Sequence, residues 1–133
     1  MSGVDENKQV VREYFASVAS GDGRVLDWLA EDVRWWVPQG SSLGGTYEGK
    51  AAVAALMQGG AGAYSSEVPM VIDVGLLVAE NDWVCAQVEL SAGTPDGRAY
   101  CNQYHFAFRL RAGQIVEVKE YVDTHYVHEM LGL

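Results

Sequence analysis

Residues 100–125, YCNQYHFAFRLRAGQIVEVKEYVDTH, decide the fold, because they read as two long strands joined by a tight turn. In the first half, apolar and aromatic residues alternate with polar ones, which is the period of a β-strand. A hairpin closed at Ala112-Gly113 has a glycine where a two-residue turn needs positive φ. This register pairs Leu110 with Ile115, Tyr104 with Tyr121 and Asn102 with Asp123.

The predicted register places Asp123 on the aromatic face of the hairpin, beside Asn102 and one step from Tyr104. A carboxylate among aromatic rings is costly to bury unless it is hydrogen-bonded or lines a polar cavity. Burial also raises its pKa toward values that suit proton transfer. The stretch therefore predicts a pocket wall that contains Asp123. An Asp near a strand end can equally cap a turn or meet solvent, and this interpretation stays open.

The composition describes one folded, acidic domain. The chain has 133 residues, 49% of them hydrophobic and 20% charged, which fits a single domain over 1–133. Its formal net charge of −9 repels phosphates, and no cluster of Lys and Arg opposes this field. We therefore expect neither nucleic acid nor a membrane as a partner. The absence of a leader-like segment and of a membrane-length apolar run predicts a cytoplasmic protein.

Helices are expected before the strands. Apolar residues at helical spacing predict three of them, at about 5–19, 25–29 and 50–57. Residues 32–37 read as a strand that Pro38 ends, and the Gly- and Ser-rich loop after it brings Tyr47 toward a pocket mouth. The segment 61–66 is flexible by composition. It is a candidate lid, although a surface linker is the more common identity of such a run.

Further strands follow over about 67–79 and 83–92, which makes the chain α+β. If Asp96-Gly97 closes the next turn, Glu89 opposes Tyr104 and shares the pocket face, whereas a slip of one residue turns Glu89 outward. The other face of this sheet would then carry an apolar patch that three short helices cannot also cover. The patch consists of Val84, Val88, Val116, Val118 and Val122. We expect it to form a homodimer through the outer sheet face.

With these residues in place, the sequence resembles the nuclear transport factor 2-like superfamily, and within it the SnoaL-like group of polyketide cyclases and limonene epoxide hydrolase. The resemblance rests on Ala19-Ser20-Gly21-Asp22, on residues 29–35 with Pro38, on Tyr47-Glu48-Gly49, on Tyr100-x-Asn102-x-Tyr104 and on residues 120–124. It implies a cone-shaped barrel in which three N-terminal helices pack on a strongly curved, mostly antiparallel sheet and enclose a deep apolar pocket.

The resemblance is specific for the fold and weak for the reaction. The epoxide hydrolases use Arg-x-Asp on one strand and an Asp on the last strand, and similarity places these positions at Gln87-Val88-Glu89 and Asp123. Gln87 stands where the Arg is needed, which argues against epoxide opening. Ketosteroid isomerases use a Tyr, here Tyr14, with two carboxylates, but those positions fall on apolar residues in this chain.

The function that we expect is a cofactor-independent acid/base enzyme of cyclase, isomerase or lyase type, acting on a small hydrophobic molecule. Asp123 and Glu89 would share one proton, and Asn102 and Tyr104 would hold a carbonyl or enolate oxygen. The pocket residues that we expect are Tyr14, Trp36, Tyr47, Gln87, Phe106 and Tyr121. An epoxide hydrolase and a non-catalytic binding module are the alternatives. No metal site is expected, because the tail around His125 and His128 is too short and exposed.

Overall fold

The predicted final hairpin lies at the centre of one six-stranded sheet. The computed structural model describes residues 3–21 and 23–133. Its strands are β1 (Leu29–Val37), β2 (Gly45–Glu48), β3 (Val71–Glu80), β4 (Trp83–Gly93), β5 (Ala99–Arg111) and β6 (Gln114–Val122). Their order is β2-β1-β6-β5-β4-β3, and every described neighbour pair is antiparallel except β1 with β6. The short strand β2 formed within the predicted Gly- and Ser-rich loop.

The helices are α1 (Gly3–Ser20), the 3₁₀ helix η1 (Gly23–Trp28), α2 (Lys50–Ala61) and α3 (Thr124–Leu131). Helix α1 ends where Gly21 takes a φ of 69°. Asp22, the last residue of the motif Ala19-Ser20-Gly21-Asp22, lies outside the described residues. Helix α2 runs four residues beyond its predicted end, and α3 replaces an expected strand end. No helix in the described ranges is long and apolar enough to cross a membrane.

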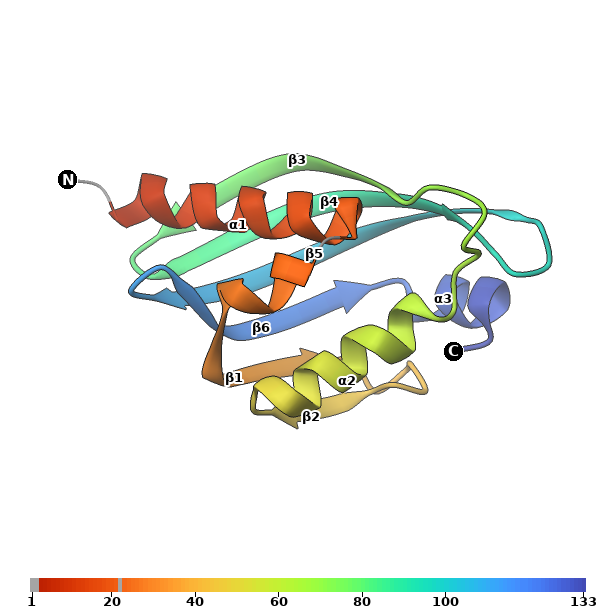
Figure 1. The fold of residues 1–133 in the computed structure, drawn as a ribbon, viewed down its shortest axis with the longest axis horizontal. Coiled ribbons are helices and arrows are strands. Elements are labelled where there is room, and N and C mark those ends of the chain that lie inside the picture. The colour runs from red at the N-terminus through yellow and green to blue at the C-terminus, as the bar shows by residue number, and fades with distance from the viewer. Residues whose placement is uncertain (1–2, 22) are drawn as a thin grey trace.

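The sheet curls around its concave face without closing, and the helices lie on that side (Figure 1). Helix α1 packs along β3 and β4, whereas α2 packs against β1 and β2. The core fills the concave face and joins Val11 and Phe15 of α1 to Phe108 of β5 and Val118 of β6. The α+β architecture with N-terminal helices on a curved sheet is therefore confirmed.

The β5–β6 hairpin contains a bulge that the alternation of apolar and polar residues did not predict. Ala112 and Gly113 form the turn with φ values of 51° and 80°, and Leu110 pairs with Ile115 as predicted. The register then shifts by one residue, because Val116 is inserted and Arg109 pairs with Glu117. From the bulge onward, each β6 residue opposes a partner one position away from the predicted one. The expected pairs of Tyr104 with Tyr121 and Asn102 with Asp123 are therefore wrong.

The β4–β5 register also differs by one residue, so that Glu89 opposes Gln103. The loop between these strands is longer than a two-residue turn, since the Thr94 backbone N–H donates to the Arg98 carbonyl at 2.9 Å and the Arg98 N–H donates to Thr94 Oγ1 at 2.8 Å. This shift turns Gln87 and Glu89 to the exposed convex face.

The valines that we expected at a subunit interface belong to the interior. The exposed fraction is 0% for Val84, 3% for Val88, 3% for Val116 and 0% for Val118, and Val122 lines a cavity. The predicted patch is therefore wrong, because the two register shifts exchanged the faces of the strands. Homodimerisation through the outer sheet face stays a prediction.

Candidate functional site

A cavity of about 570 Å³ lies between the concave face of the sheet and the helices. Its wall is mostly aliphatic and aromatic, with contributions from α1, α2, η1, α3 and the sheet. The polar side chains among the described lining residues are Tyr14, Trp35, Ser41, Gln58, Tyr64, Tyr104 and Glu120. Glu120 carries the only carboxylate in this set. The volume falls in the range of small-molecule sites.

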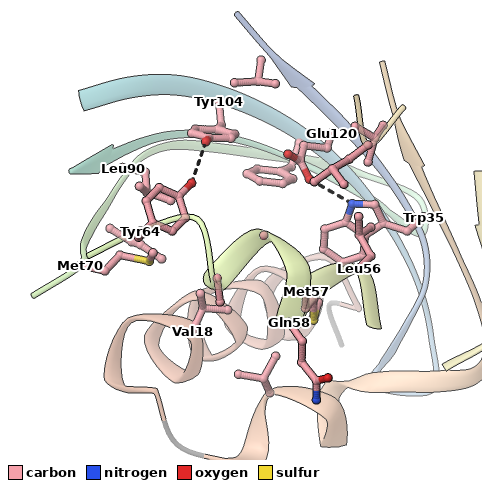
Figure 2. A pocket seen from close by; sticks show the side chains of 18 of the residues that line it. Val18, Trp35, Leu56, Met57, Gln58, Tyr64, Met70, Leu90, Tyr104 and Glu120 are labelled. Atoms are coloured by element: carbon pink, nitrogen blue, oxygen red, sulfur yellow. Dashed lines mark hydrogen bonds between the residues drawn. The ribbon is translucent and has the colours of Figure 1, made fainter. Parts of the chain in front are cut away.

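Glu120 reaches the cavity from β6, where it lies opposite Phe106 of β5. Trp35 Nε1 donates a hydrogen bond of 3.0 Å to Glu120 Oε1 (Figure 2). The other oxygen, Oε2, has no hydrogen-bond partner in the described part of the chain. No described buried polar side-chain atom lacks a partner, so Oε2 must still be reachable from the cavity. One oxygen is thus anchored and the other is available to a bound molecule.

Burial raises the pKa of Glu120 above its usual value, and the hydrogen bond from Trp35 opposes part of this rise. Burial also raises the pKa of Tyr14, with a further contribution from the charge of Glu120. Tyr14 therefore stays protonated around neutral pH, whereas Glu120 can exchange a proton closer to neutrality than an ordinary glutamate can.

Aromatic rings fix the surroundings of Glu120. The Trp35 and Phe106 ring centroids lie 6.5 Å apart at 77°, and those of Tyr14 and Trp35 lie 6.4 Å apart. Tyr104, Phe106 and Phe108 follow one another on the same face of β5 as a stack, with centroid separations of 5.7 Å and 5.5 Å. Such packed rings have few alternative rotamers, so the position of the carboxylate is well defined.

A second polar group lies along the same wall, where Tyr104 Oη is 3.4 Å from Tyr64 Oη and 2.8 Å from Tyr100 Oη. Tyr64 belongs to the segment 62–70, which includes part of the candidate lid. The backbone N–H of Ser65 donates to the Gly93 carbonyl at 2.8 Å and fastens this segment to the end of β4. The segment thus contributes a side chain to the cavity.

The structure does not place the two expected catalytic carboxylates in the cavity. Asp123 is the N-cap of α3 and is exposed, and its side chain accepts a hydrogen bond of 3.1 Å from the Tyr126 backbone N–H. Glu89 is exposed on the convex face, where it accepts a hydrogen bond of 2.7 Å from Gln103 Nε2. The expected placement of both residues in the cavity is wrong. Asp123 instead has a capping role, which the sequence had left open as the alternative.

The other expected residues divide between the two faces. Tyr14, Tyr104 and Phe106 line the cavity, whereas Asn102 is buried behind it. Gln87 is on the convex face, as are Trp36 and Tyr121, whose ring centroids lie 5.0 Å apart next to a separate surface hollow. Tyr47 donates to the Leu43 carbonyl at 2.6 Å and is not part of the lining.

Three functional candidates were missed, namely Glu120, Trp35 and Tyr64. Adjacent residues on a strand face opposite ways, so the choice between Trp35 and Trp36 and between Glu120 and Tyr121 depended on phase alone. A bulge changes that phase without a distinctive local sequence signal. The Tyr in the candidate lid was a signal that could have placed Tyr64 at the cavity.

Within residues 3–21 and 23–133, no group of three or more His, Cys, Asp or Glu side chains is arranged to hold a metal ion. The groups that the cavity lining offers for proton transfer are Glu120 and the tyrosine hydroxyls. These groups provide one proton acceptor and neutral hydrogen-bond donors in an apolar cavity.

Known structures share this arrangement of helices and sheet. An NTF2-like protein of unknown function from Burkholderia pseudomallei aligns with a TM-score of 0.84 at 24% identity, over 100% of both chains. A candidate polyketide cyclase from Xanthomonas campestris aligns with a TM-score of 0.81 at 24% identity, over 98% of this chain and 99% of its own. TerC, co-crystallised with polyporic acid, aligns with a TM-score of 0.84 at 19% identity, over 96% and 99%.

No curated protein matches the chain significantly in sequence. The model of the SnoaL-like domain matches residues 11–118, which include β1, most of the hairpin and most of the cavity wall. This match covers well over half of the chain and agrees with the fold. The chain therefore belongs to the SnoaL-like domain family.

Proposed function

We propose that this chain is an acid/base enzyme of cyclase, isomerase or lyase type that acts on a small hydrophobic or aromatic molecule, with Glu120 as the group that takes up and returns the proton. One observation carries the proposal: Glu120 has one oxygen held by Trp35 and the other open to an apolar cavity. Family membership and the likeness to a candidate polyketide cyclase support the class of reaction.

The geometry suits proton transfer in three respects. A raised pKa makes the Glu120 carboxylate a stronger base than an exposed glutamate. The hydrogen bond from Trp35 orients the carboxylate and stabilises its ionised form between turnovers. The apolar wall excludes much of the water that would compete for the proton. A proton taken from one atom and returned to another gives an isomerisation. A carbanion that adds to a second carbonyl carbon of the same molecule closes a ring, breaks the C=O π bond and leaves an alkoxide, which takes back the proton from Glu120.

The test is exchange of carbon-bound protons with solvent deuterium, followed by NMR for a panel of apolar carbon acids. Glu120→Gln should reduce the enzyme-dependent exchange rate by about a hundredfold or more, since general-base catalysis typically contributes on the order of that factor. Asp123→Asn is the matched control. It makes the same carboxylate-to-amide change outside the cavity and keeps the oxygen that caps α3, so exchange should persist.

Equal exchange by wild type and Glu120→Gln would remove Glu120 from the mechanism. Tight binding of a panel member without any exchange would instead favour a non-catalytic binding module. An epoxide hydrolase is not supported, because Gln87 and Glu89, which correspond to its Arg-x-Asp strand, face away from the cavity.

A further inference from the structure

The buried polar groups beside the cavity form a hydrogen-bond chain with a fixed direction. The chain consists of Asn102, Tyr100, Tyr104 and Tyr64, and we call it the tyrosine chain. The Gln103 backbone N–H can only donate, and it lies 2.9 Å from Asn102 Oδ1, so this amide oxygen must be the acceptor. Asn102 Nδ2 consequently faces Tyr100 Oη at 3.0 Å, and it can only donate. The amide thus sets the direction of the whole chain.

Tyr100 continues the chain in the same direction, because it accepts from Asn102 and donates to Tyr104. Its exposed fraction is 1%, and its hydroxyl oxygen already accepts from Asn102. A buried hydroxyl proton needs an acceptor, and Tyr104 Oη is 2.8 Å away, so Tyr100 donates to Tyr104. Tyr100 does not belong to the described residues that line the cavity, and it therefore acts only through Tyr104.

One hydroxyl proton is left over at the cavity end. Tyr104 and Tyr64 carry two hydroxyl protons, but only one of them can lie between oxygens that are 3.4 Å apart. Both residues line the cavity, so the remaining O–H is available to a molecule bound there. Burial raises the pKa of Tyr64 and of Tyr104, so both stay protonated at neutral pH. The cavity end of the tyrosine chain is therefore a neutral donor.

We propose that the Tyr64–Tyr104 pair donates a hydrogen bond to a carbonyl oxygen of the bound molecule, so that the substrates of this site are apolar ketones or related carbonyl compounds with an acidic C–H next to the carbonyl. The choice of an acidic C–H rests on the proposed role of Glu120. The oxygen acceptor rests on the tyrosine chain alone. A donor that is itself hydrogen-bonded from behind also favours the enolate that forms when such a C–H loses its proton.

The spacing along the sheet fits this class of molecule. Glu120 lies opposite Phe106, and Tyr104 is two residues along β5 on the same face, so Tyr104 and Glu120 are diagonal neighbours with backbone positions about 7–8 Å apart. The carbonyl oxygen and the adjacent carbon are separated by two bonds. A carbonyl group can therefore meet the donor at one end while its neighbouring C–H faces the carboxylate.

The experiment compares acetonaphthone, which has a carbonyl acceptor, with ethylnaphthalene, which has the same ring system and none. Calorimetry gives both affinities, and isotope-edited infrared difference spectra give the carbonyl stretch of bound acetonaphthone. In wild type the stretch should lie below its value in an alkane solvent. In the double variant Tyr64→Phe/Tyr104→Phe it should return to that value, and the affinity for acetonaphthone relative to ethylnaphthalene should fall by about tenfold.

Tyr100→Phe tests the direction of the tyrosine chain, because this residue is not part of the lining. It should leave the affinity for ethylnaphthalene unchanged and reduce the carbonyl shift without abolishing it. Ethylnaphthalene also serves as the folding control for every variant. A wild-type stretch equal to that in alkane, no preference for acetonaphthone over ethylnaphthalene, or an unchanged stretch in the double variant would each overturn the proposal.

Glu120→Gln separates this inference from the proposed function. The variant should lose proton exchange and keep the carbonyl shift, because the tyrosine chain does not include Glu120. A wild-type protein that shows the shift but no Glu120-dependent exchange would retain the carbonyl site and reject Glu120 as the base. Exchange that depends on Glu120 without any carbonyl shift would reject the carbonyl site and retain the base.

Discussion

Glu120 is the one carboxylate side chain among the described lining residues, and the pairing of β6 with β5 places it opposite Phe106. The alternation along β5 is local, so it correctly predicted that Tyr104 and Phe106 share the face of the cavity. The residue opposite them on β6 depends on the bulge at Val116. That bulge lets Ile115 and Val116 both be buried and joins Arg109 to Glu117 at 3.2 Å, which is a result of packing that local alternation does not encode.

The raised pKa of Glu120 predicts a specific dependence of stability on pH. The folded state holds this proton more firmly than the unfolded state, so ionisation costs stability as pH rises from the ordinary glutamate pKa through the folded-state pKa. Relative to wild type, Glu120→Gln should therefore gain free energy of unfolding across that window, by about 1.4 kcal/mol for each unit by which the pKa is raised.

Urea denaturation of both proteins at a series of pH values measures this difference. The gap should close at acid pH, where Glu120 is protonated in both states. The Asp123→Asn variant makes the same carboxylate-to-amide change at an exposed position outside the cavity and is measured alongside as the control. Curves for wild type and Glu120→Gln that run parallel from acid to alkaline pH would contradict the inferred burial of charge.

At the scale of elements, the segment 62–70 shows where composition stops being informative. The composition of residues 61–66 predicted flexibility and left lid and linker both open. In the structure, the Ser65 backbone N–H donates a hydrogen bond to the Gly93 carbonyl. Tyr64 packs on Tyr100 with ring centroids 5.5 Å apart. These contacts join residues far apart in the chain, and no local pattern encodes them.

Gly93→Ala tests this attachment. A Cβ on Gly93 would lie 2.7 Å from Val68 Cγ2 and 2.9 Å from Val68 Cβ, so the segment must move. We expect a loss of about 1–3 kcal/mol in the free energy of unfolding and a weaker carbonyl shift of bound acetonaphthone, because Tyr64 moves with the segment. Thermal unfolding and infrared spectra measure the two effects.

The matched rescue is Val68→Ala in the Gly93→Ala background. Val68 is 47% exposed, so its truncation alone should cost little, and it removes Cγ2, the nearer of the two atoms that the new Cβ meets. The Cβ of residue 68 stays, so the recovery is expected to be partial. Recovery of both the unfolding temperature and the carbonyl shift would show that the contact with Val68 positions Tyr64. A single variant with wild-type values would show that the segment is not held at Gly93.

At the scale of the whole molecule, the fold was predictable because helical spacing, strand alternation and the family resemblance all extend over most of the chain. Which face of each strand points toward the core was not predictable from the sequence. Val84 and Val88 on β4 alternate in the same way whether they face a core or a partner. Only the register with β5, set by the Thr94 loop, shows that they face the helices.

Val118→Glu distinguishes a core from an interface. Val118 is 0% exposed and would bury an unpaired charge, so the variant should lose roughly 3–5 kcal/mol and fail to fold stably. Lys119→Glu changes the exposed neighbour and should leave the fold within about 0.5 kcal/mol of wild type. Circular dichroism with urea denaturation measures both. A folded, monomeric Val118→Glu protein would instead support the original interface prediction.

The bulge at Val116 also affects how this sequence should be aligned with its relatives. Glu120 is held by pairing with β5, and the extra residue lies between it and the turn at Ala112-Gly113. A relative without this insertion would carry its equivalent acidic residue one position closer to the turn. An alignment that permits no gap there would match Glu120 with an outward-facing residue, so the equivalent position is better identified as the residue that pairs with Phe106.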